Sequence, residues 1–165
     1  MREVSVKELA INPFTLIGEE WGLVTAGSKE KFNTMTVSWG GMGVLWGKNV
    51  VFVFIRPQRY TYEFMENSEY FTLSFFPEGF KPVLSLCGSK SGRDIDKVKE
   101  TGLTPLFSDN AVYFEQSKLV FVCKKLAEAP MDPNGFIDQT INNNYVKGDY
   151  HRMFAAELVK VYAAD

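Results

Sequence analysis

Short apolar runs separated by turn residues recur along the chain. They are rich in Val, Phe, Tyr and Thr, which favour β-strands, and Gly, Pro and Asn stand between them. This pattern predicts strands within residues 14–27, 32–38, 49–55 and 70–76, and within the runs that start at residues 111 and 150. Helical periodicity is confined to short pieces at residues 60–67, 81–88 and 94–101.

The spacing of these elements predicts the fold class. Several strands close together, with few long helical crossovers, favour a mainly β, antiparallel barrel with small helices packed at its ends. No internal repeat, low-complexity segment or linker divides the sequence. We therefore predict a single domain over residues 1–165, a length that is sufficient to bury a sizeable core.

The net charge and the hydropathy of the chain argue against two kinds of partner, nucleic acids and membranes. The formal net charge is −2, which argues against the basic surface that nucleic-acid binding needs. The first residues have no apolar signal-peptide core, and the longest aliphatic and aromatic run, residues 50–55, is too short to span a bilayer. We expect a soluble, cytoplasmic protein with no nucleic-acid or membrane partner.

Residues that carry metal or nucleophilic chemistry are scarce. Cys87 and Cys123 are too few and too far apart for a disulfide framework or a CxxC pair, so we expect two reduced thiols. The single histidine, His151, rules out multi-histidine zinc sites, and we expect no metal centre. A thiol nucleophile paired with His151 stays an alternative that nothing in the sequence favours.

Two glycine-containing segments fail the motifs that they resemble. In residues 39–49, a Walker A loop would need Gly in place of Met42, and GxGxxG would need Gly in place of Trp46. In residues 88–92, a serine nucleophile elbow would need Ser in place of Lys90. We expect neither a nucleotide-binding loop of these types nor a serine hydrolase.

The segment IRPQRYTYEF, residues 55–64, has the features of an anion site. A helix is predicted to begin near Arg59, where its first backbone N–H groups lack partners. With the guanidinium groups of Arg56 and Arg59 and the hydroxyl of Thr61, these groups would form a phosphate cradle. The alternative is that Arg59 pairs with Glu63 on an exposed helix face, and that Arg56 only caps a strand edge.

A second polar turn follows at residues 89–97, SKSGRDIDK. Ser91 and Asp94 have the spacing of a capping-box-like start for the helix predicted over residues 94–101. Lys90 and Arg93 flank this turn and could serve the same anion.

Four motifs in order resemble one known family. They are NTMTVSWGGMGVLWGK from residue 33, RPQRYTYEF from residue 56, SGRDIDK from residue 91 and GDYHRMFAAEL from residue 148. From about residue 12 to its end, the chain resembles the flavin reductase-like family with the FMN-binding split barrel, close to flavoredoxin-type members.

The resemblance implies a homodimer of split β-barrels with FMN at the interface. The strand within residues 32–38 would hydrogen-bond the flavin through its backbone amides and its four polar side chains, those of Asn33, Thr34, Thr36 and Ser38. Gly40 and Gly41 would let the chain pass close to the ring, and Arg56, Arg59 and Thr61 would hold the phosphate. The FMN-binding residues that it implies are Asn33, Thr34, Met35, Thr36, Ser38, Trp39, Arg56, Gln58, Arg59, Tyr60, Thr61, Lys90, Ser91 and Arg93.

Several aromatic residues have two interpretations. Trp39 either covers the flavin or packs in the core. His151 either helps to place a nicotinamide, as the resemblance implies, or is a surface or hydrogen-bonded residue of the last strand. Among the many Phe residues, we expect Phe75, Phe76, Phe80 and Phe107 to build the core and the dimer contact.

The resemblance also implies the activity. Hydride would pass from NADH or NADPH to FMN, and electrons would then pass to a small-molecule or protein acceptor, with no side chain required as acid or base. One alternative is a flavoredoxin-like electron carrier that exchanges electrons with a partner protein without NAD(P)H. Another is a barrel that binds a different ligand and has no redox role.

Overall fold

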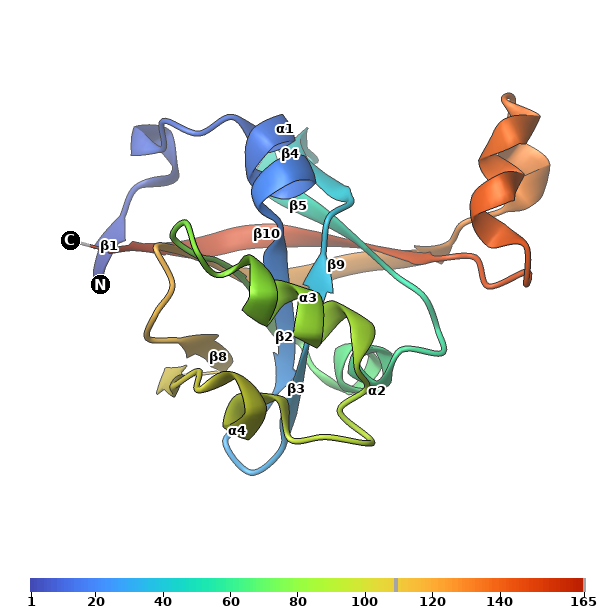
Figure 1. Ribbon diagram of the computed structural model, residues 1–165. Coiled ribbons are helices and arrows are strands. Elements are labelled where there is room, and N and C mark those ends of the chain that lie inside the picture. Colours follow the sequence, from blue (N-terminus) through green and yellow to red (C-terminus); the bar gives the residue numbers. More distant parts are fainter. Residues whose placement is uncertain (109, 165) are drawn as a thin grey trace.

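The computed structural model describes residues 1–108 and 110–164, and most of its regular structure is β. The strands are β1 (Arg2–Val4), β2 (Gly22–Gly27), β3 (Phe32–Val37), β4 (Gly40–Leu45), β5 (Lys48–Ile55), β6 (Tyr70–Phe75), β7 (Pro105–Ser108), β8 (Ala111–Phe114), β9 (Leu119–Pro130) and β10 (Arg152–Ala163). In this part of the chain, one antiparallel sheet has the order β3-β2-β6-β9-β10-β5-β4, with β1 also paired to β10, and β7 pairs with β8 separately (Figure 1). The predicted mainly β, antiparallel fold is confirmed.

Short helices flank the sheet. They are η1 (Val6–Glu8), α1 (Pro13–Thr15), the π-helical turn η2 (Leu16–Glu20), α2 (Tyr60–Asn67), α3 (Lys81–Ser89), α4 (Lys97–Thr101), η3 (Pro133–Gly135) and η4 (Gln139–Tyr145). The predicted helices at residues 60–67 and 81–88 are confirmed as α2 and α3. In Figure 1, α3 crosses in front of β2, and the structure packs its Gly88 against Thr36 of β3.

Three local predictions were wrong. Residues 14–20 are helical because Asn12 caps the chain there, accepting from the N–H of Phe14, and Pro13 occupies the first helical position. The helix expected over residues 94–101 begins only at Lys97, with Asp96 as its cap. Ser91 accepts from the N–H of Arg93 and so closes a turn instead of starting that helix.

The glycine-rich segment that failed the nucleotide-loop motifs is a strand. β4 pairs with β5 through a two-residue turn at Trp46 and Gly47, which both have positive φ, as a tight antiparallel hairpin requires. Gly40 lies opposite Val53 in this hairpin, and an added Cβ there would lie 2.7 Å from the carbonyl oxygen of Phe52. Gly40 is therefore needed for strand pairing.

We expect Gly40→Ala to lower the free energy of unfolding by about 1–3 kcal/mol, because its methyl group would push into the β5 backbone. The matched control is Gly41→Ala, which has open space around its Cβ and should change stability by less than about 1 kcal/mol. Chemical denaturation measures both variants. Equal stability of the two would contradict the packing described for Gly40.

Two groups of apolar side chains form the core. The larger one fills the interior of the sheet and includes Phe75, and a second one under α3 includes Phe76. Phe80 packs against the second group while only partly buried, and Phe107 is 40% exposed with its edge on Phe32. The core role predicted for Phe75 and Phe76 is thus confirmed, whereas Phe107 lies at the surface.

Both cysteines are buried free thiols, as predicted. Burial raises the pKa of Cys87 and of Cys123, which disfavours the thiolate that a nucleophile would need. In the part of the chain that the structure describes, no helix is long and apolar enough to cross a membrane.

The hairpin of β9 and β10 carries a long excursion, residues 131–150. In Figure 1 this orange segment, with η3 and η4, lies at the end of the hairpin that is remote from both chain termini. The excursion returns to the body of the protein at Asp149 and His151, directly before β10. It therefore brings residues from the last third of the chain to the start of α2.

Candidate functional site

Two hollows meet at Arg59, which precedes the first turn of α2. The Thr61 hollow has a volume of about 170 Å³, and of the predicted residues it is lined by Asn33, Gln58, Arg59, Tyr60, Thr61, Lys90 and Ser91. The Trp39 hollow has a volume of about 190 Å³ and is lined by Met35, Thr36, Ser38, Trp39, Arg56, Arg59 and His151. The structure thus brings most of the predicted site residues together around one arginine.

Backbone donors face the Thr61 hollow. The helix ladder supplies no partner to the N–H groups of Tyr60 and Thr61, while that of Tyr62 donates to the carbonyl oxygen of Arg59 at 2.9 Å. The N-cap residue, Arg59, makes no side-chain cap. Thr61 is 1% exposed, and its hydroxyl oxygen accepts from the side-chain amide of Asn33 at 2.7 Å. Since that oxygen is the acceptor, its own hydrogen is left to donate to a ligand. This end of α2 therefore offers several donors to one anion.

Two cations border the Thr61 hollow without a carboxylate partner among the described residues. Lys97 is 5% exposed, and its ammonium donates to the carbonyl oxygens of Thr34 and Cys87, both at 2.7 Å. The guanidinium of Arg59 donates to the carbonyl oxygen of Gly88 at 2.8 Å. Burying a cation without a counter-charge is unfavourable, so these two groups point to an anionic ligand.

The pKa values of both cations are lowered, as expected for buried cations without a counter-charge. Burial, with a smaller contribution from the charge of Arg59, lowers the pKa of Lys97 to about 8. Burial and the neighbouring Arg56 lower the pKa of Arg59. A bound phosphate would raise both pKa values, because its negative charge would stabilise the protonated, charged forms of Lys97 and Arg59.

Turn geometry shapes the other wall of this hollow. The turn at residues 89–92 lies against Asn33, and an added Cβ at Gly92 would collide with the side-chain amide of Asn33. Glycine at this position therefore lets Lys90 and Ser91 approach α2, as their place in the lining shows.

The polar strand does not present its four side chains to one side. Successive residues of a strand face opposite sides, so Asn33 lies on the face opposite Thr34, Thr36 and Ser38. The hydroxyl of Thr34 is buried, 2.9 Å from the hydroxyl of Thr25, and that of Thr36 donates to the carbonyl oxygen of Leu84. The hydroxyls of Thr34 and Thr36 are thus engaged within the protein, and contact of the four polar residues with one ligand stays a prediction.

β3 still borders the site through its backbone. It is the last strand of the sheet order, so its outer edge pairs with no strand in the described part of the chain. The carbonyl oxygen of Thr34 on this edge accepts from Lys97. Because the N–H and C=O of a strand residue point to the same side, alternate backbone groups along β3 are available to a flat polar ligand.

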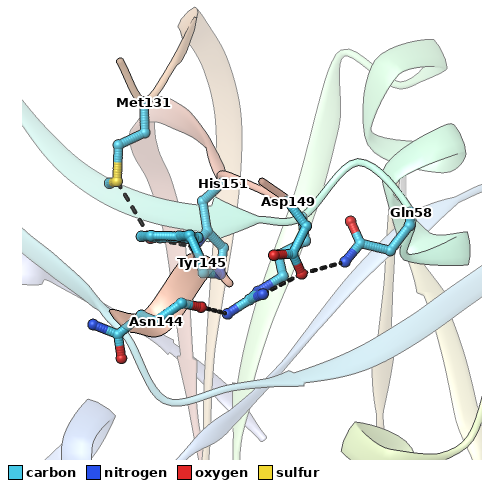
Figure 2. A network of polar contacts seen from close by, with 7 residues as sticks. Gln58, Met131, Asn144, Tyr145, Asp149 and His151 are labelled. Carbon is cyan, nitrogen blue, oxygen red and sulfur yellow. Dashed lines mark hydrogen bonds and ion pairs between the residues drawn. The ribbon is translucent and has the colours of Figure 1, made fainter. Parts of the chain in front are cut away.

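Arg56 has a different role from the one that its sequence position suggested. Its guanidinium forms an ion pair with Asp149 and donates to the carbonyl oxygen of Asn144 at 2.9 Å. Gln58 donates to the same Asp149 carboxylate at 2.9 Å (Figure 2). Arg56 therefore anchors the excursion and lines the Trp39 hollow, while it does not line the Thr61 hollow where the anion donors gather.

The alternative pairing of Arg59 with Glu63 was also wrong. Glu63 forms its ion pair with Arg93, whose guanidinium lies 4.6 Å from the centre of the Tyr60 ring. Arg93 consequently lies on the outside of the turn and does not line the Thr61 hollow.

Trp39 and His151 form the outer wall of the Trp39 hollow. Trp39 is 49% exposed, so its packing in the core, one of the two interpretations, was wrong. Its ring centre lies 5.4 Å from that of His151, which is 9% exposed and 2.7 Å from the hydroxyl of Tyr145 through Nδ1. Burial and the charge of Arg56 lower the pKa of His151 to about 4, so the ring is neutral at pH 7.

We expect the protein to lose stability between pH 7 and pH 5. The pKa of His151 is about 4 in the folded chain and about 6.5 in the unfolded chain, so only the unfolded chain takes up a proton in this window. The free energy of unfolding should therefore fall by about 2 kcal/mol, at about 1.36 kcal/mol per unit of pKa difference.

Chemical denaturation of the flavin-free protein at both pH values measures this loss. The matched control is His151→Asn, which removes the titrating group and should show a much smaller change. A loss of equal size in both proteins would exclude His151 as its source.

Sequence reasoning missed three residues at this site. Lys97 lies in the SKSGRDIDK segment but was not predicted to bind the anion, because nothing in the sequence indicates that its side chain is buried. Asp149 and Tyr145 lie in the excursion, whose helical turns carry no periodic pattern. Only the "GDYH" motif around His151 could have drawn attention to Asp149.

The fold is that of the split-barrel proteins that bind FMN. The family model described as flavin reductase like domain matches residues 16–165, and the chain belongs to this family. Among curated proteins, no sequence matches this chain. The predicted family is therefore confirmed.

Solved structures show the same fold at low sequence identity. An FMN-binding protein from Thermus thermophilus is 20% identical with a TM-score of 0.71, over 100% of this chain and 83% of that one. Flavoredoxin of Desulfovibrio vulgaris (Miyazaki F) is 20% identical with a TM-score of 0.69, over 100% and 78%. The styrene monooxygenase flavin reductase from Pseudomonas putida S12 is 14% identical with a TM-score of 0.65, over 88% and 80%.

Proposed function

We propose that the chain is an FMN-dependent oxidoreductase that passes hydride or electrons from NADH or NADPH, through bound FMN, to an acceptor. The observation that carries this proposal is the pair of uncompensated cations, Lys97 and Arg59, beside the uncapped start of α2. Membership of the flavin reductase-like family also supports FMN as the ligand. So do the names of the similar structures, which include an FMN-binding protein, a flavoredoxin and a flavin reductase.

The Thr61 hollow fits the phosphate of FMN. A phosphate dianion needs several N–H and O–H donors and positive charge, and this hollow offers the first N–H groups of α2, the hydroxyl of Thr61, and the side chains of Arg59 and Lys97. Lys90 and Ser91 lie at its rim and would add further donors. Its volume of about 170 Å³ suits a phosphate and its neighbouring atoms, not a whole flavin.

The Trp39 hollow and the edge of β3 fit the remainder of FMN. Asn33 and the backbone of β3 would bind the polar edge and the ribityl chain, and Met35, Thr36, Ser38 and Trp39 would lie along the ring. Arg59 lines both hollows, so it would hold the ligand at the point where phosphate and ribityl chain meet. Thr34 and Arg93 would contribute through the backbone and through support of the Tyr60 ring, respectively.

The protein's own contribution would be binding, orientation and exclusion of water. FMN, when bound, supplies the acceptor and donor chemistry for hydride and electrons. The donors along β3 would favour negative charge on the polar edge of the ring, and the Trp39 side chain would shield one part of the hollow from solvent. No side chain is needed as an acid or base for this role.

Anaerobic visible absorption spectroscopy tests the proposal. The protein is loaded with FMN, and NADH and then NADPH are added in separate runs. We expect the bound flavin to bleach with at least one of them, faster than free FMN under the same conditions. A protein that does not bind FMN would refute the whole proposal.

The second candidate is an electron carrier that does not use NAD(P)H. Trp39, which lines the Trp39 hollow, is an aromatic side chain that is half exposed, which would suit contact with a partner protein. In the same experiment, this candidate predicts a bound flavin that stays oxidised with both nicotinamides but is reduced by dithionite.

We also propose that the chain forms a homodimer with FMN at its interface. Large apolar side chains are exposed in α1, at the tip of the hairpin of β4 and β5, and on the excursion, namely Phe14, Val44, Trp46, Ile137 and Val146. Burying them against a second copy would remove unfavourable apolar surface from water. The single-domain organisation and the soluble, cytoplasmic location stay predictions.

A further inference from the structure

Tyr145, in the excursion, lies between two possible acceptors. Its hydroxyl oxygen is 2.7 Å from Nδ1 of His151 and 3.3 Å from Sδ of Met131 (Figure 2). The excursion is held in place on its other side by the ion pair of Asp149 with Arg56. Tyr145 is 5% exposed, so these contacts lie inside the protein.

The single hydroxyl hydrogen of Tyr145 decides where the proton of His151 resides. An imidazole nitrogen is a much stronger acceptor than a thioether sulfur, and it is also the nearer of the two. The hydroxyl of Tyr145 therefore donates to Nδ1. A neutral imidazole that accepts at Nδ1 carries its one hydrogen on Nε2.

The surroundings of His151 keep the ring neutral. The charged groups that face it are Arg56, which opposes protonation, and Asp149, which favours it but is paired with Arg56. Trp39 and Tyr145 contribute aromatic surface on two further sides. The ring edge that bears Nε2 lies away from Tyr145, and His151 lines the Trp39 hollow.

We propose that Tyr145 is a positioning residue that fixes the proton of His151 on Nε2, so that His151 presents a neutral hydrogen-bond donor to the Trp39 hollow. The ligand group that suits this donor is an uncharged acceptor, such as the carbonyl oxygen of an amide or imide. The ligand part rests on the proposed function, which assigns this hollow to the flavin ring.

Nitrogen NMR of ¹⁵N-histidine-labelled protein tests the proton position directly. Because His151 is the only histidine, the spectrum contains one pair of ring nitrogens. At pH 7 we expect an unprotonated Nδ1 and a protonated Nε2. In Tyr145→Phe the donor to Nδ1 is lost, and both signals should move toward the averaged values of a tautomer mixture. A protonated Nδ1 in the unaltered protein would overturn the proposal.

Two further variants separate this role from general loosening of the excursion. Tyr150→Phe removes a neighbouring hydroxyl that bonds Asn142, and its ring lies 4.7 Å from that of Tyr145, so it is a matched control. Met131→Leu removes the competing acceptor. We expect both to keep the original pair of signals. If Tyr145→Phe also keeps them, or if Met131→Leu changes them, the proposal is wrong.

Addition of ligands tests the part of the proposal that concerns the hollow. FMN binding is first measured by flavin fluorescence, which tests the proposed function separately from the tautomer. The Nε2 signal should shift when FMN is added to the flavin-free protein, or when NAD⁺ or NADP⁺ is added to the FMN-loaded protein, and the Nδ1 signal should shift much less. An Nε2 signal that none of these moves would overturn the assignment of the donor to the ligand, even though FMN binds.

Discussion

Arg59→Ala is expected to weaken FMN binding by about a hundredfold or more. The guanidinium of Arg59 is half-buried, lines both hollows and has no carboxylate partner in the described part of the chain. Removal of one member of a buried, hydrogen-bonded charge pair costs about 2–5 kcal/mol, and about 3 kcal/mol corresponds to a hundredfold in the dissociation constant. Quenching of flavin fluorescence measures the affinity.

The matched control for Arg59→Ala is Arg152→Ala. Arg152 pairs with Glu128 on the hairpin and lines neither hollow, so the affinity for FMN should stay within a few-fold of the original. Circular dichroism shows whether each variant is folded. If a folded Arg59→Ala protein binds FMN as well as Arg152→Ala does, Arg59 is not part of the phosphate site.

The affinity for FMN is expected to fall about tenfold between pH 8 and pH 9.5. In the free protein the pKa of Lys97 is about 8, so its ammonium loses its proton over this range. A bound phosphate would hold the proton on Lys97 and so raise its pKa, which means that binding takes up a proton. The phosphate itself is fully ionised in this range because its second pKa is about 6.

Lys97→Met isolates the source of this pH dependence. Methionine keeps much of the length and apolar surface of lysine but cannot carry a charge, so its affinity for FMN should be lower at pH 8 and nearly constant up to pH 9.5. The free variant should be about as stable as the original protein, because removal of a buried ammonium without a counter-charge offsets the loss of its hydrogen bonds to the carbonyl oxygens of Thr34 and Cys87. A parallel fall of affinity in both proteins would exclude Lys97.

The regular elements of the fold could be predicted where one periodic pattern was dominant. Residues 60–67 and the strand at residues 70–76 follow patterns that tertiary contacts do not override. Residues 14–20 were misassigned because their apolar, β-branched content outweighed the Asn12–Pro13 start signal in the prediction. β4 has little strand propensity, since glycine occupies three of its positions, and pairing with β5 supplies its order.

The types of residue at the candidate site could be predicted from the sequence, but the contacts between them and their burial could not. The sequence correctly placed Arg59 and Thr61 at the start of a helix, because the change from a strand to a helix is visible in the local sequence. It could not show that Asp149 binds Arg56 across 93 residues of chain, or that Lys97 is buried. Such facts depend on how distant segments meet, which local patterns do not encode.

We propose that Arg59, Lys97, Thr61 and the start of α2 together bind the phosphate of FMN. Isothermal titration of the flavin-free protein with FMN and with riboflavin, which differ only in the phosphate, tests this claim most directly. We predict that FMN binds at least about a hundredfold more tightly, because riboflavin leaves the two buried cations without a counter-charge. Equal affinities for FMN and riboflavin would contradict the phosphate site and the account that is built on it.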